Sequence, residues 1–382
     1  YYGAGEREKN NLPQNTRKFG NVARYALTRM TEELNAGGGK VVYKDYIRVI
    51  NNYLIPYFGK KKVDSIDARQ LMEYASWRDM KMGSAKEEVR IRGLRNKIKD
   101  YQRLKEELGK EPKPFKAKQS TINTHNSALN RVLDEALLRG WITDSIKPTL
   151  LNKGIKTESR GAFSIDEYRT IYKGLRSWTG TGHRQETREL CEVLREYVLF
   201  LANTGIRHGT EAISIKWSNI RYFTGLDKEV YLEVAVDGKV GKRQLVARDN
   251  TARYLERLRD LNDSIKHLTL KELLSKQLDV EVFRTRSGYN PTTDALRGSF
   301  RQYLEQAGIL RDTNGVTRSL YCLRHTYATF RLFSGTNIHQ LATQMGTSVK
   351  MLETFYSKVS PQMNAAIHSG RLETIQREEQ ED

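Results

Sequence analysis

Apolar residues recur at three- and four-residue intervals along most of the chain, a pattern that is typical of amphipathic helices. In the first part of the chain this periodicity predicts helices at 19–37, 43–59, 65–82, 85–106 and 120–142. Pro56 is expected to break the second of these helices. Ser65 or Asp67 is expected to cap the third helix, and Ser120 the fifth, which Gly140 ends.

The second part of the chain combines helical spacing with one stretch of alternation. Apolar and polar residues alternate over 230–248 around Gly238 and Gly241, which predicts a β-hairpin. Helical spacing predicts further elements at about 187–203, 249–263, 293–307, 323–334, 338–345 and 348–356. The expected fold is therefore mainly α with a small antiparallel β-sheet, an α+β class.

Composition marks the borders between these parts. The stretch LNKGIKTESRG at 151–161 is polar and basic, and we expect it to be a linker. The expected segments on either side of it are an N-terminal segment at 1–39, a helical domain at 40–150, a second domain at 162–359 and a C-terminal tail at 360–382.

Charge is the most prominent global property, with 65 Lys and Arg residues against 46 Asp and Glu residues and a net charge of +19. Such an excess favours a polyanionic partner, nucleic acid before an anionic membrane. No apolar run approaches the roughly 20 residues needed to cross a bilayer, so no membrane partner is expected. Cys191 and Cys322 are far apart and the histidines do not cluster with them, which predicts no disulfide, no metal and a reduced cytoplasmic setting.

Four side chains in the second part could carry chemistry. Arg207 lies between two glycines in NTGIRHGTE, where a turn lets the backbone approach a ligand closely. Lys239 stands at the tip of the predicted hairpin, and Arg324 and Tyr356 lie in YCLRHTYATF and KMLETFYSKV. Each also has an ordinary structural explanation. Arg207 could cap a helix end, and Lys239 could be a solvated turn residue. Arg324 could lie on a solvated helix flank, and Tyr356 could be a core aromatic residue.

The surroundings of Arg324 leave two orientations open. Leu323, Tyr327 and Phe330 recur at helical intervals and predict a buried face. One step along a helix turns a side chain by about 100°, so Arg324 can face solvent or a site while Leu323 anchors the helix. This stretch taken alone favours the solvated flank.

The four points, in this order and spacing, resemble the tyrosine recombinase (phage integrase) family. The resemblance is carried by the arginine after a helix, the hairpin lysine, LRHTYAT, and MGTS with a tyrosine about ten residues on, and it covers residues from about 40 to 365. It implies a helical core DNA-binding domain followed by a catalytic domain. The 1–39 segment would be a remnant of an arm-binding module, or a connector to one.

The resemblance also implies roles for individual residues. Arg207 and Arg324 would be the two catalytic arginines, with Arg324 pointing into the active site. Lys239 would be the hairpin lysine, for which Lys242 is the weaker choice. Tyr356 would be the nucleophile.

Three further residues would support the active site: Glu211, Tyr321 and Thr347. By this resemblance, Glu211 would be the acidic residue that supports the turn of Arg207. Tyr321 stands where the family usually has histidine, and Thr347 where it has histidine or tryptophan, so proton transfer is expected to rely more on the lysine. His325 directly follows Arg324, is turned about 100° from it, and does not replace the missing histidine.

The implied function is that of a site-specific DNA recombinase, an integrase that acts through a 3′-phosphotyrosine intermediate and integrates or excises a mobile element. Guanidinium forks can stabilise charge on phosphate oxygens, and a lysine can protonate the leaving 5′-hydroxyl. Because the bond energy is kept in the phosphotyrosine, no cofactor is expected. Two alternatives stay open, a type IB topoisomerase-like nicking-closing enzyme and a catalytically impaired DNA-binding relative.

The implied partner is double-stranded DNA that carries attachment or recombination sites. The resemblance further implies a monomer free in solution, a homo-tetramer on paired sites with the 360–382 tail on a neighbouring protomer, and accessory DNA-bending proteins. It implies a cytoplasmic, nucleoid-associated protein of bacterial or phage origin. Residues expected to contact DNA are Lys116, Lys118, Ser120, Thr121, Asn123 and Lys242.

Overall fold

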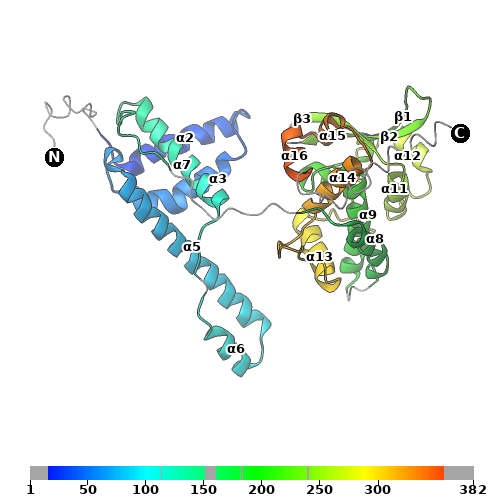
Figure 1. Cartoon of the computed structure of the whole chain (residues 1–382), viewed down its shortest axis with the longest axis horizontal. Coiled ribbons are helices and arrows are strands. Elements are labelled where there is room, and N and C mark those ends of the chain that lie inside the picture. The colour runs from blue at the N-terminus through cyan, green and yellow to red at the C-terminus, as the bar shows by residue number, and fades with distance from the viewer. Residues whose placement is uncertain are drawn as a thin grey trace, which may run out of the picture. The chain divides into compact units, whose positions relative to one another are not determined.

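A computed structural model of the protein describes residues 16–112, 114–150, 161–180, 182, 184–238 and 241–356. The chain divides into two units, Tyr1–Thr157 and Glu158–Asp382. Figure 1 draws the first in blue to blue-green and the second in green to red. Lys239 and the 360–382 tail lie outside the described residues, as does most of the expected linker, so what the sequence predicts for them stays a prediction.

The described part of the first unit is built from helices. Its elements are α2 (Phe19–Asn35), α3 (Tyr43–Val49), a π-helix (Ile50–Leu54), α4 (Ile55–Phe58), a 3₁₀ turn (Val63–Ser65), α5 (Ala68–Lys97), α6 (Tyr101–Leu108) and α7 (Gln119–Leu138). Phe19, Leu54, Phe58 and Leu129 are buried in one core to which α2, α4, the π-helix and α7 contribute. Because α2 supplies part of this core, it belongs to the helical unit, and a domain border at residue 40 would cut through that core.

Two local predictions in this unit are wrong. Pro56 does not break the second helix, because it stands in the first turn of α4, directly after the π-helix, where a missing N–H is tolerated. Ser120 does not cap α7, because the last extended residue is Lys118 and the helix has already begun at Gln119. Asp67 does cap α5, and its carboxylate accepts a hydrogen bond from a backbone N–H at 2.8 Å.

The helices predicted at 65–82 and 85–106 are divided at a different place. One helix, α5, runs without interruption through Gly83 to residue 97, and the short helix α6 follows it. A Cβ on Gly83 would lie 3.1 Å from the Phe115 side chain. The glycine therefore leaves room for the segment at Phe115 to pack on α5, and it does not end the helix.

The second unit packs helices around a small sheet. Its helices are α8 (Ile165–Trp178), α9 (Gln185–Thr204), α10 (Thr210–Ile213), α11 (Thr251–Asp260), α12 (Leu270–Ser275), α13 (Thr293–Gln306), α14 (Tyr321–Phe333), α15 (Ile338–Met345) and α16 (Val349–Tyr356), with a 3₁₀ turn at Trp217–Asn219. The strands β1 (Ile220–Thr224), β2 (Val230–Gly238) and β3 (Gly241–Ala247) form an antiparallel sheet in this order. The predicted hairpin is confirmed, whereas β1 has no counterpart among the predicted elements.

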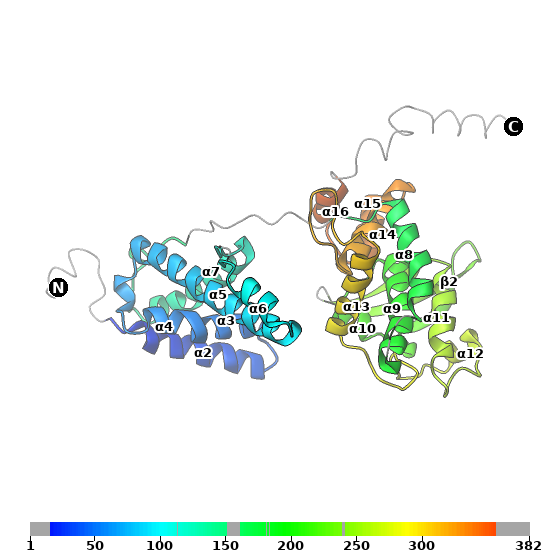
Figure 2. The same cartoon turned by 90° about the horizontal axis from the view of Figure 1, so that it is seen from below.

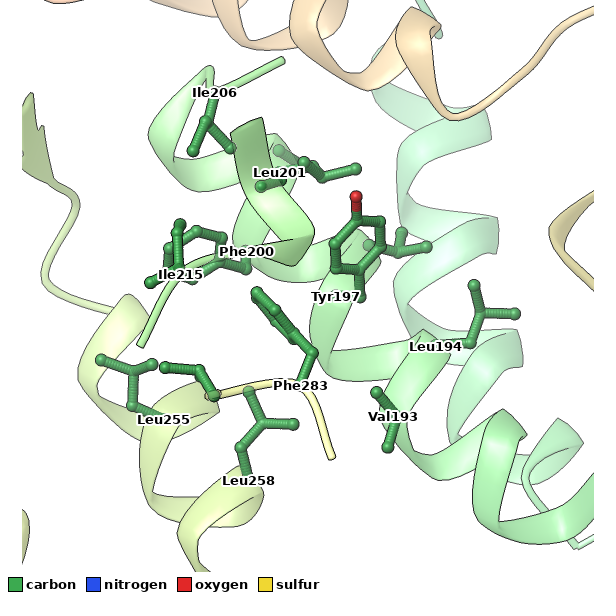
Figure 3. Packing of buried hydrophobic residues seen from close by; sticks show 14 of the residues in the cluster. Val193, Leu194, Tyr197, Phe200, Leu201, Ile206, Ile215, Leu255, Leu258 and Phe283 are labelled. Atoms are coloured by element: carbon green, nitrogen blue, oxygen red, sulfur yellow. The ribbon is translucent and has the colours of Figure 1, made fainter. Parts of the chain in front are cut away.

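Helix α9 is the centre of the second unit. Its apolar residues are buried around most of its circumference, as expected for a helix that other elements enclose. The rings of Tyr197 and Phe200 pack against Phe283 at centroid distances of 4.9 and 5.4 Å, and Leu255 and Leu258 of α11 lie in the same cluster (Figure 3). Because α8, α11, α13 and α14 all contact α9, its position is set by packing on several sides (Figure 2).

We expect Phe283→Ala to lower the free energy of unfolding by about 3–5 kcal/mol, because the ring fills the space between Tyr197 and Phe200. Chemical unfolding with urea measures the change. Leu226→Ala is the matched control, because Leu226 is fully exposed and its truncation is expected to change stability by less than about 0.5 kcal/mol. Equal effects of the two substitutions would contradict the role given to this cluster.

Candidate active site

The candidate site begins at the turn after α9. This helix ends at Gly205, whose φ of +67° lies in the left-handed region that glycine adopts without strain. A Cβ on Gly205 would overlap the ring of Tyr327, so no larger residue fits. Arg207 follows two residues later, and Glu211 lies in α10, so the turn brings both side chains to the end of α9.

Arg324 reaches the same turn from α14. Its side chain is buried, with a residue exposure of 4%. The Nη1 atom donates a hydrogen bond to the carbonyl oxygen of Gly205 at 2.6 Å, and Nη2 donates to that of Met345 at 2.7 Å. The guanidinium group therefore points into the unit and not into solvent.

The helix that carries Arg324 is anchored by its apolar face. Leu323 and Tyr327 are buried, as the helical spacing predicts. Phe330 is only half-buried, and its ring packs edge-on against Tyr168 at a centroid distance of 5.8 Å. Adjacent residues of α14 thus take different tasks, one in the core and the next in the candidate site.

Arg207 is bound by a second helix end. Its Nη1 donates to Glu211 Oε2 at 3.1 Å, and its Nη2 donates to the carbonyl oxygen of Gly346. Gly346 ends α15 with a φ of +60°. Arg207 and Arg324 therefore bond to consecutive carbonyls at the C-terminal end of α15, where helix dipoles concentrate partial negative charge.

The carboxylate of Glu211 joins this turn to the sheet. It is 5% exposed and forms ion pairs with both Arg207 and Arg243, a residue of β3. Burial raises the pKa of Glu211, but hydrogen bonds and charges from Arg243 and Arg207 outweigh burial, so this pKa lies below its ordinary value. Glu211 is therefore ionised at neutral pH.

Arg243 is the residue of this site that the sequence analysis missed. Its guanidinium group packs on the α15 turn, because a Cβ on Gly346 would lie 2.8 Å from Arg243 Nε. Among the described residues, its Nε and Nη1 are buried without a hydrogen-bond partner. Arg243 alternates with the exposed residues of β3 and shares a face with the buried Leu245 and Ala247. The alternation of exposed and buried positions along 241–247 is the sequence feature that could have identified Arg243 as inward-facing.

The hairpin tip lies against the same carboxylate. A Cβ on Gly238, the last residue of β2, would overlap the carboxylate of Glu211, so the strand passes directly over it. Gly238 pairs with Gly241 and immediately precedes Lys239, which is outside the described residues. Lys242 is exposed and points to the other face of β3 from Arg243.

Tyr321 and Thr347 occupy the two positions at which the sequence departs from the resembled family. Tyr321 opens α14 and is half-buried, with its ring edge-on to His325, one turn further along, at a centroid distance of 4.9 Å. Thr347 follows Gly346, and its backbone N–H donates to the carbonyl of Ala342 at 3.0 Å, which closes the end of α15. His325 thus lies beside the tyrosine in the same helix.

Tyr356 is the last residue of α16, and its side chain lies outside the described part of the structure. Leu352 anchors the helix, because it is buried in a small cluster with Tyr327, Leu341 and Met345. α16 therefore contacts both α14, which carries Arg324, and α15, which ends at the arginine-bound carbonyls.

Three guanidinium groups and one carboxylate give this site a net charge of about +2. Burial, and then the neighbouring Arg207, lower the pKa of Arg324 to about 10, so it stays protonated at neutral pH. Such a site attracts an anion with several oxygens. The described residues contain no group of three or more His, Cys, Asp or Glu side chains that could hold a metal ion. None of the described helices is long and apolar enough to cross a membrane.

The other predicted contacts with DNA lie in the first unit. Lys116, Lys118, Ser120 and Asn123 are exposed and Thr121 is half-buried, around the first turn of α7. Asn123 accepts a hydrogen bond from the Gln119 side chain at 2.9 Å. These polar and basic residues all lie within a few positions of the start of α7.

The fold is that of the tyrosine recombinases. Structures of this class align over most of the chain at 15% sequence identity. The Tn1549 transposon integrase in complex with a circular intermediate DNA aligns over 92% of this chain and 99% of its own, with a TM-score of 0.53. The XerH site-specific recombinase bound to a palindromic difH substrate aligns over 92% and 94%, with a TM-score of 0.53. No protein-family model and no curated protein matches the sequence.

We expect Glu211→Gln to lower the free energy of unfolding by about 3 kcal/mol at neutral pH, because two half-buried cations lose the buried carboxylate that pairs with them. The folded-state pKa of Glu211 is depressed, so its contribution is full above the ordinary glutamate pKa of about 4.3 and fades as the pH falls toward the folded value. Urea unfolding at pH 7, 5 and 3.5 should therefore show a difference from wild type that shrinks with acid. Glu256→Gln, at an exposed acid, is the control, and a difference independent of pH would contradict this role.

Proposed function

We propose that the protein is a site-specific DNA recombinase of the integrase type. It cleaves and rejoins double-stranded DNA through a 3′-phosphotyrosine intermediate, and it integrates or excises a mobile element. One observation carries the proposal. Arg207 and Arg324, which are far apart in sequence, are bound to consecutive carbonyls at the turn directly before α16, the helix that ends at Tyr356.

The chemistry assigned to these residues is a transesterification. The phenol oxygen of Tyr356 gives its proton to water and forms a bond to phosphorus, while the bond from phosphorus to the 5′ oxygen breaks. Arg207 and Arg324 stabilise the charge that develops on the non-bridging oxygens. Lys239 gives a proton to the leaving 5′ oxygen, and attack by a 5′-hydroxyl on the phosphotyrosine reverses the step. No cofactor takes part.

Arg243 acts in this proposal by positioning other residues. Its bond to Glu211 orients the carboxylate that in turn holds Arg207. Tyr321 and Thr347 can donate hydrogen bonds to a phosphate, but they are poor proton-transfer groups near neutral pH. Lys239 is therefore the main proton donor in this proposal. The missing imidazoles are also the observation that keeps a catalytically impaired DNA-binding relative as the second candidate.

Several observations support DNA as the partner. The solved structures of the same fold include DNA complexes, among them a lambda integrase dimer bound to a core site, which aligns over 93% of this chain with a TM-score of 0.52 and 15% identity. The net charge of +19 and the exposed residues at the start of α7 suit phosphate contact. Lys242, exposed beside the hairpin tip, would add a further contact.

The assembly proposed is a monomer in solution and a homo-tetramer on paired sites. A lambda integrase tetramer bound to a Holliday junction has the same fold, with a TM-score of 0.50 and 16% identity. The 360–382 tail would contact the neighbouring protomer, and accessory proteins would bend the DNA. We place the protein in the cytoplasm, on the nucleoid, with a bacterial or phage origin.

Tyr356→Phe is expected to abolish the covalent adduct between protein and DNA while it leaves DNA affinity unchanged, because only the phenol oxygen is lost. The substrate is a library of nicked duplexes. Covalent adducts are recovered from it under denaturing conditions, and sequencing of the attached DNA reveals the target sequence. Mass spectrometry of the recovered peptide locates the attached residue. An adduct formed by the phenylalanine variant would rule out Tyr356 as nucleophile, and a wild-type chain that binds DNA without any adduct would favour the impaired relative.

Lys239→Ala is expected to slow cleavage of a normal 5′-hydroxyl leaving group by about 10²–10⁴-fold, the usual contribution of a proton donor. A 5′-thio leaving group needs little protonation and should restore the rate. Arg324→Ala serves as the comparison, because the loss of a buried charge donor should slow both substrates alike. Single-turnover cleavage on the selected duplex measures both effects, and a Lys239→Ala variant that thiol substitution does not rescue would refute the proton-donor role.

A further inference from the structure

Helices α5 and α6 form an arm that leaves the helical bundle of the first unit. Beyond Gly83, α5 contacts α6 and the returning segment at Phe115. Figure 1 shows the two helices projecting from the bundle made by α2, α3 and α7. Residues 83–97 of α5 alone span roughly 22 Å at 1.5 Å per residue, so the tip of the arm lies far from the core of its own unit.

Charges at the base of the arm are paired within the arm. Arg90 donates to the Glu87 carboxylate at 2.8 Å and to the backbone carbonyl of Glu107 at 3.1 Å. Lys110 forms an ion pair with the Glu107 side chain, and Lys86 lies over the ring of Phe115 at 5.6 Å. Arg90 therefore joins α5 to α6, and Lys86 and Lys110 also have partners within the arm.

The tip of the arm, residues 92–105, has a different charge pattern. Six of its fourteen residues are basic, namely Arg92, Arg95, Lys97, Lys99, Arg103 and Lys105. The one acidic residue, Asp100, caps α6 by accepting a hydrogen bond from the Arg103 N–H at 2.7 Å. Arg92, Arg95, Lys99, Arg103 and Lys105 are exposed, and no ion pair involves them within the described part of the chain.

The tip has little apolar surface to offer a hydrophobic partner. α6 has no buried residue among those described, and Leu94, Ile98 and Leu104 are half-buried. Tyr101 is the exception, with an exposed fraction of 73% and a hydroxyl that can donate to an acceptor. A concentrated positive charge with one accessible aromatic residue suits a phosphate backbone better than a membrane or an apolar protein surface.

We propose that the tip of the α5–α6 arm contacts duplex DNA, as a contact of the first unit separate from the one at the first turn of α7. That the polyanion is DNA rests on the proposed function. A reach of roughly 22 Å corresponds to about six base pairs at 3.4 Å each, so the arm extends the bound length of duplex. Its contribution is to affinity and to footprint, while the cleavage step is left unchanged.

The first experiment removes three charges from the tip with Arg92→Ala, Arg95→Ala and Arg103→Ala in one chain. Alanine is the best helix former, so α5 and α6 keep their structure. On a random 40-base-pair duplex, the slope of log affinity against log salt concentration should become less steep by about 2.7 in the variant. Between 50 and 200 mM salt, wild type should therefore lose about 40-fold more affinity than the variant loses. Cleavage of the selected duplex at saturating protein should stay at the wild-type rate.

A matched control removes three exposed basic residues from helices of the second unit: Lys173→Ala, Arg176→Ala and Lys271→Ala. It changes the net charge by the same amount, so a general electrostatic effect would move both variants equally. Equal slopes for the two variants would overturn the proposal. If the tip variant binds DNA like wild type but fails to assemble paired sites, the tip contacts a second copy of the chain, which also overturns it.

The second experiment places a reporter at the tip. Cys191 and Cys322 are buried, so Gln102→Cys, at an exposed position of α6, can be labelled selectively with an iron chelate that cleaves nearby DNA. We expect strand cutting several-fold above that of the same label at Lys173→Cys, and its loss when the three tip arginines are replaced. Cutting no stronger than at the control position would refute the contact. Failure of the proposed function would show instead as absence of any covalent adduct, whatever the arm does.

Discussion

The ion pairs of one buried carboxylate, Glu211, are the interaction on which the candidate active site depends. Arg207 and Arg243 come from a helix turn and from a strand, and in a space with little water their charges would repel each other strongly. The shared carboxylate makes their approach favourable and ties the sheet to the turn after α9. Arg324 is held differently, by two backbone carbonyls. The result is a net positive site whose geometry the protein sets before any ligand arrives.

The rest of the second unit serves to fix the helix ends that meet at this site. α9 is enclosed on most sides by apolar packing, so the position of Gly205 is set by the core. Tyr327 fills the space beside Gly205 and also belongs to the cluster that anchors α16 through Leu352. Packing in the interior is dense enough that a shift of one helix is felt by its neighbours. The arginine turn, α14 and α16 therefore form one connected arrangement.

Much of the fold can be predicted from spacing alone, and the misses have physical causes. The hairpin and the helices from α13 to α16 follow from regular periodicity. The sequence predicts a helix end near Gly83. The actual reason for the glycine is that Phe115 packs on it, and this contact cannot be seen in the local sequence. Pro56 reads as a break, because a π-helix ahead of it cannot be recognised from residue types.

The site is predictable in part, through the family resemblance and not through spacing alone. Arg207, Glu211 and Arg324 stand in segments with a distinctive order, and the structure brings them together. Arg243 lies in the basic stretch GKVGKR, where charge alone does not show which of the basic residues belongs to the site. Only its place on the inner face of β3, in register with the buried Leu245 and Ala247, separates it from Lys242. What a side chain contacts across the fold is not encoded in its local pattern.

The carbonyl bonds of the two arginines bear on which residues these positions can accept. A guanidinium group has five N–H donors in a rigid plane, so Arg324 can donate to the carbonyls of Gly205 and Met345 and keep other donors for an anionic ligand. A lysine has one nitrogen at the end of a flexible chain, and its three donors start from a single point. Its donors cannot reach two separate carbonyls and a ligand with the spread that the guanidinium plane allows. At such a position arginine therefore differs from lysine in donor geometry as much as in chemistry, even though the two side chains carry the same charge.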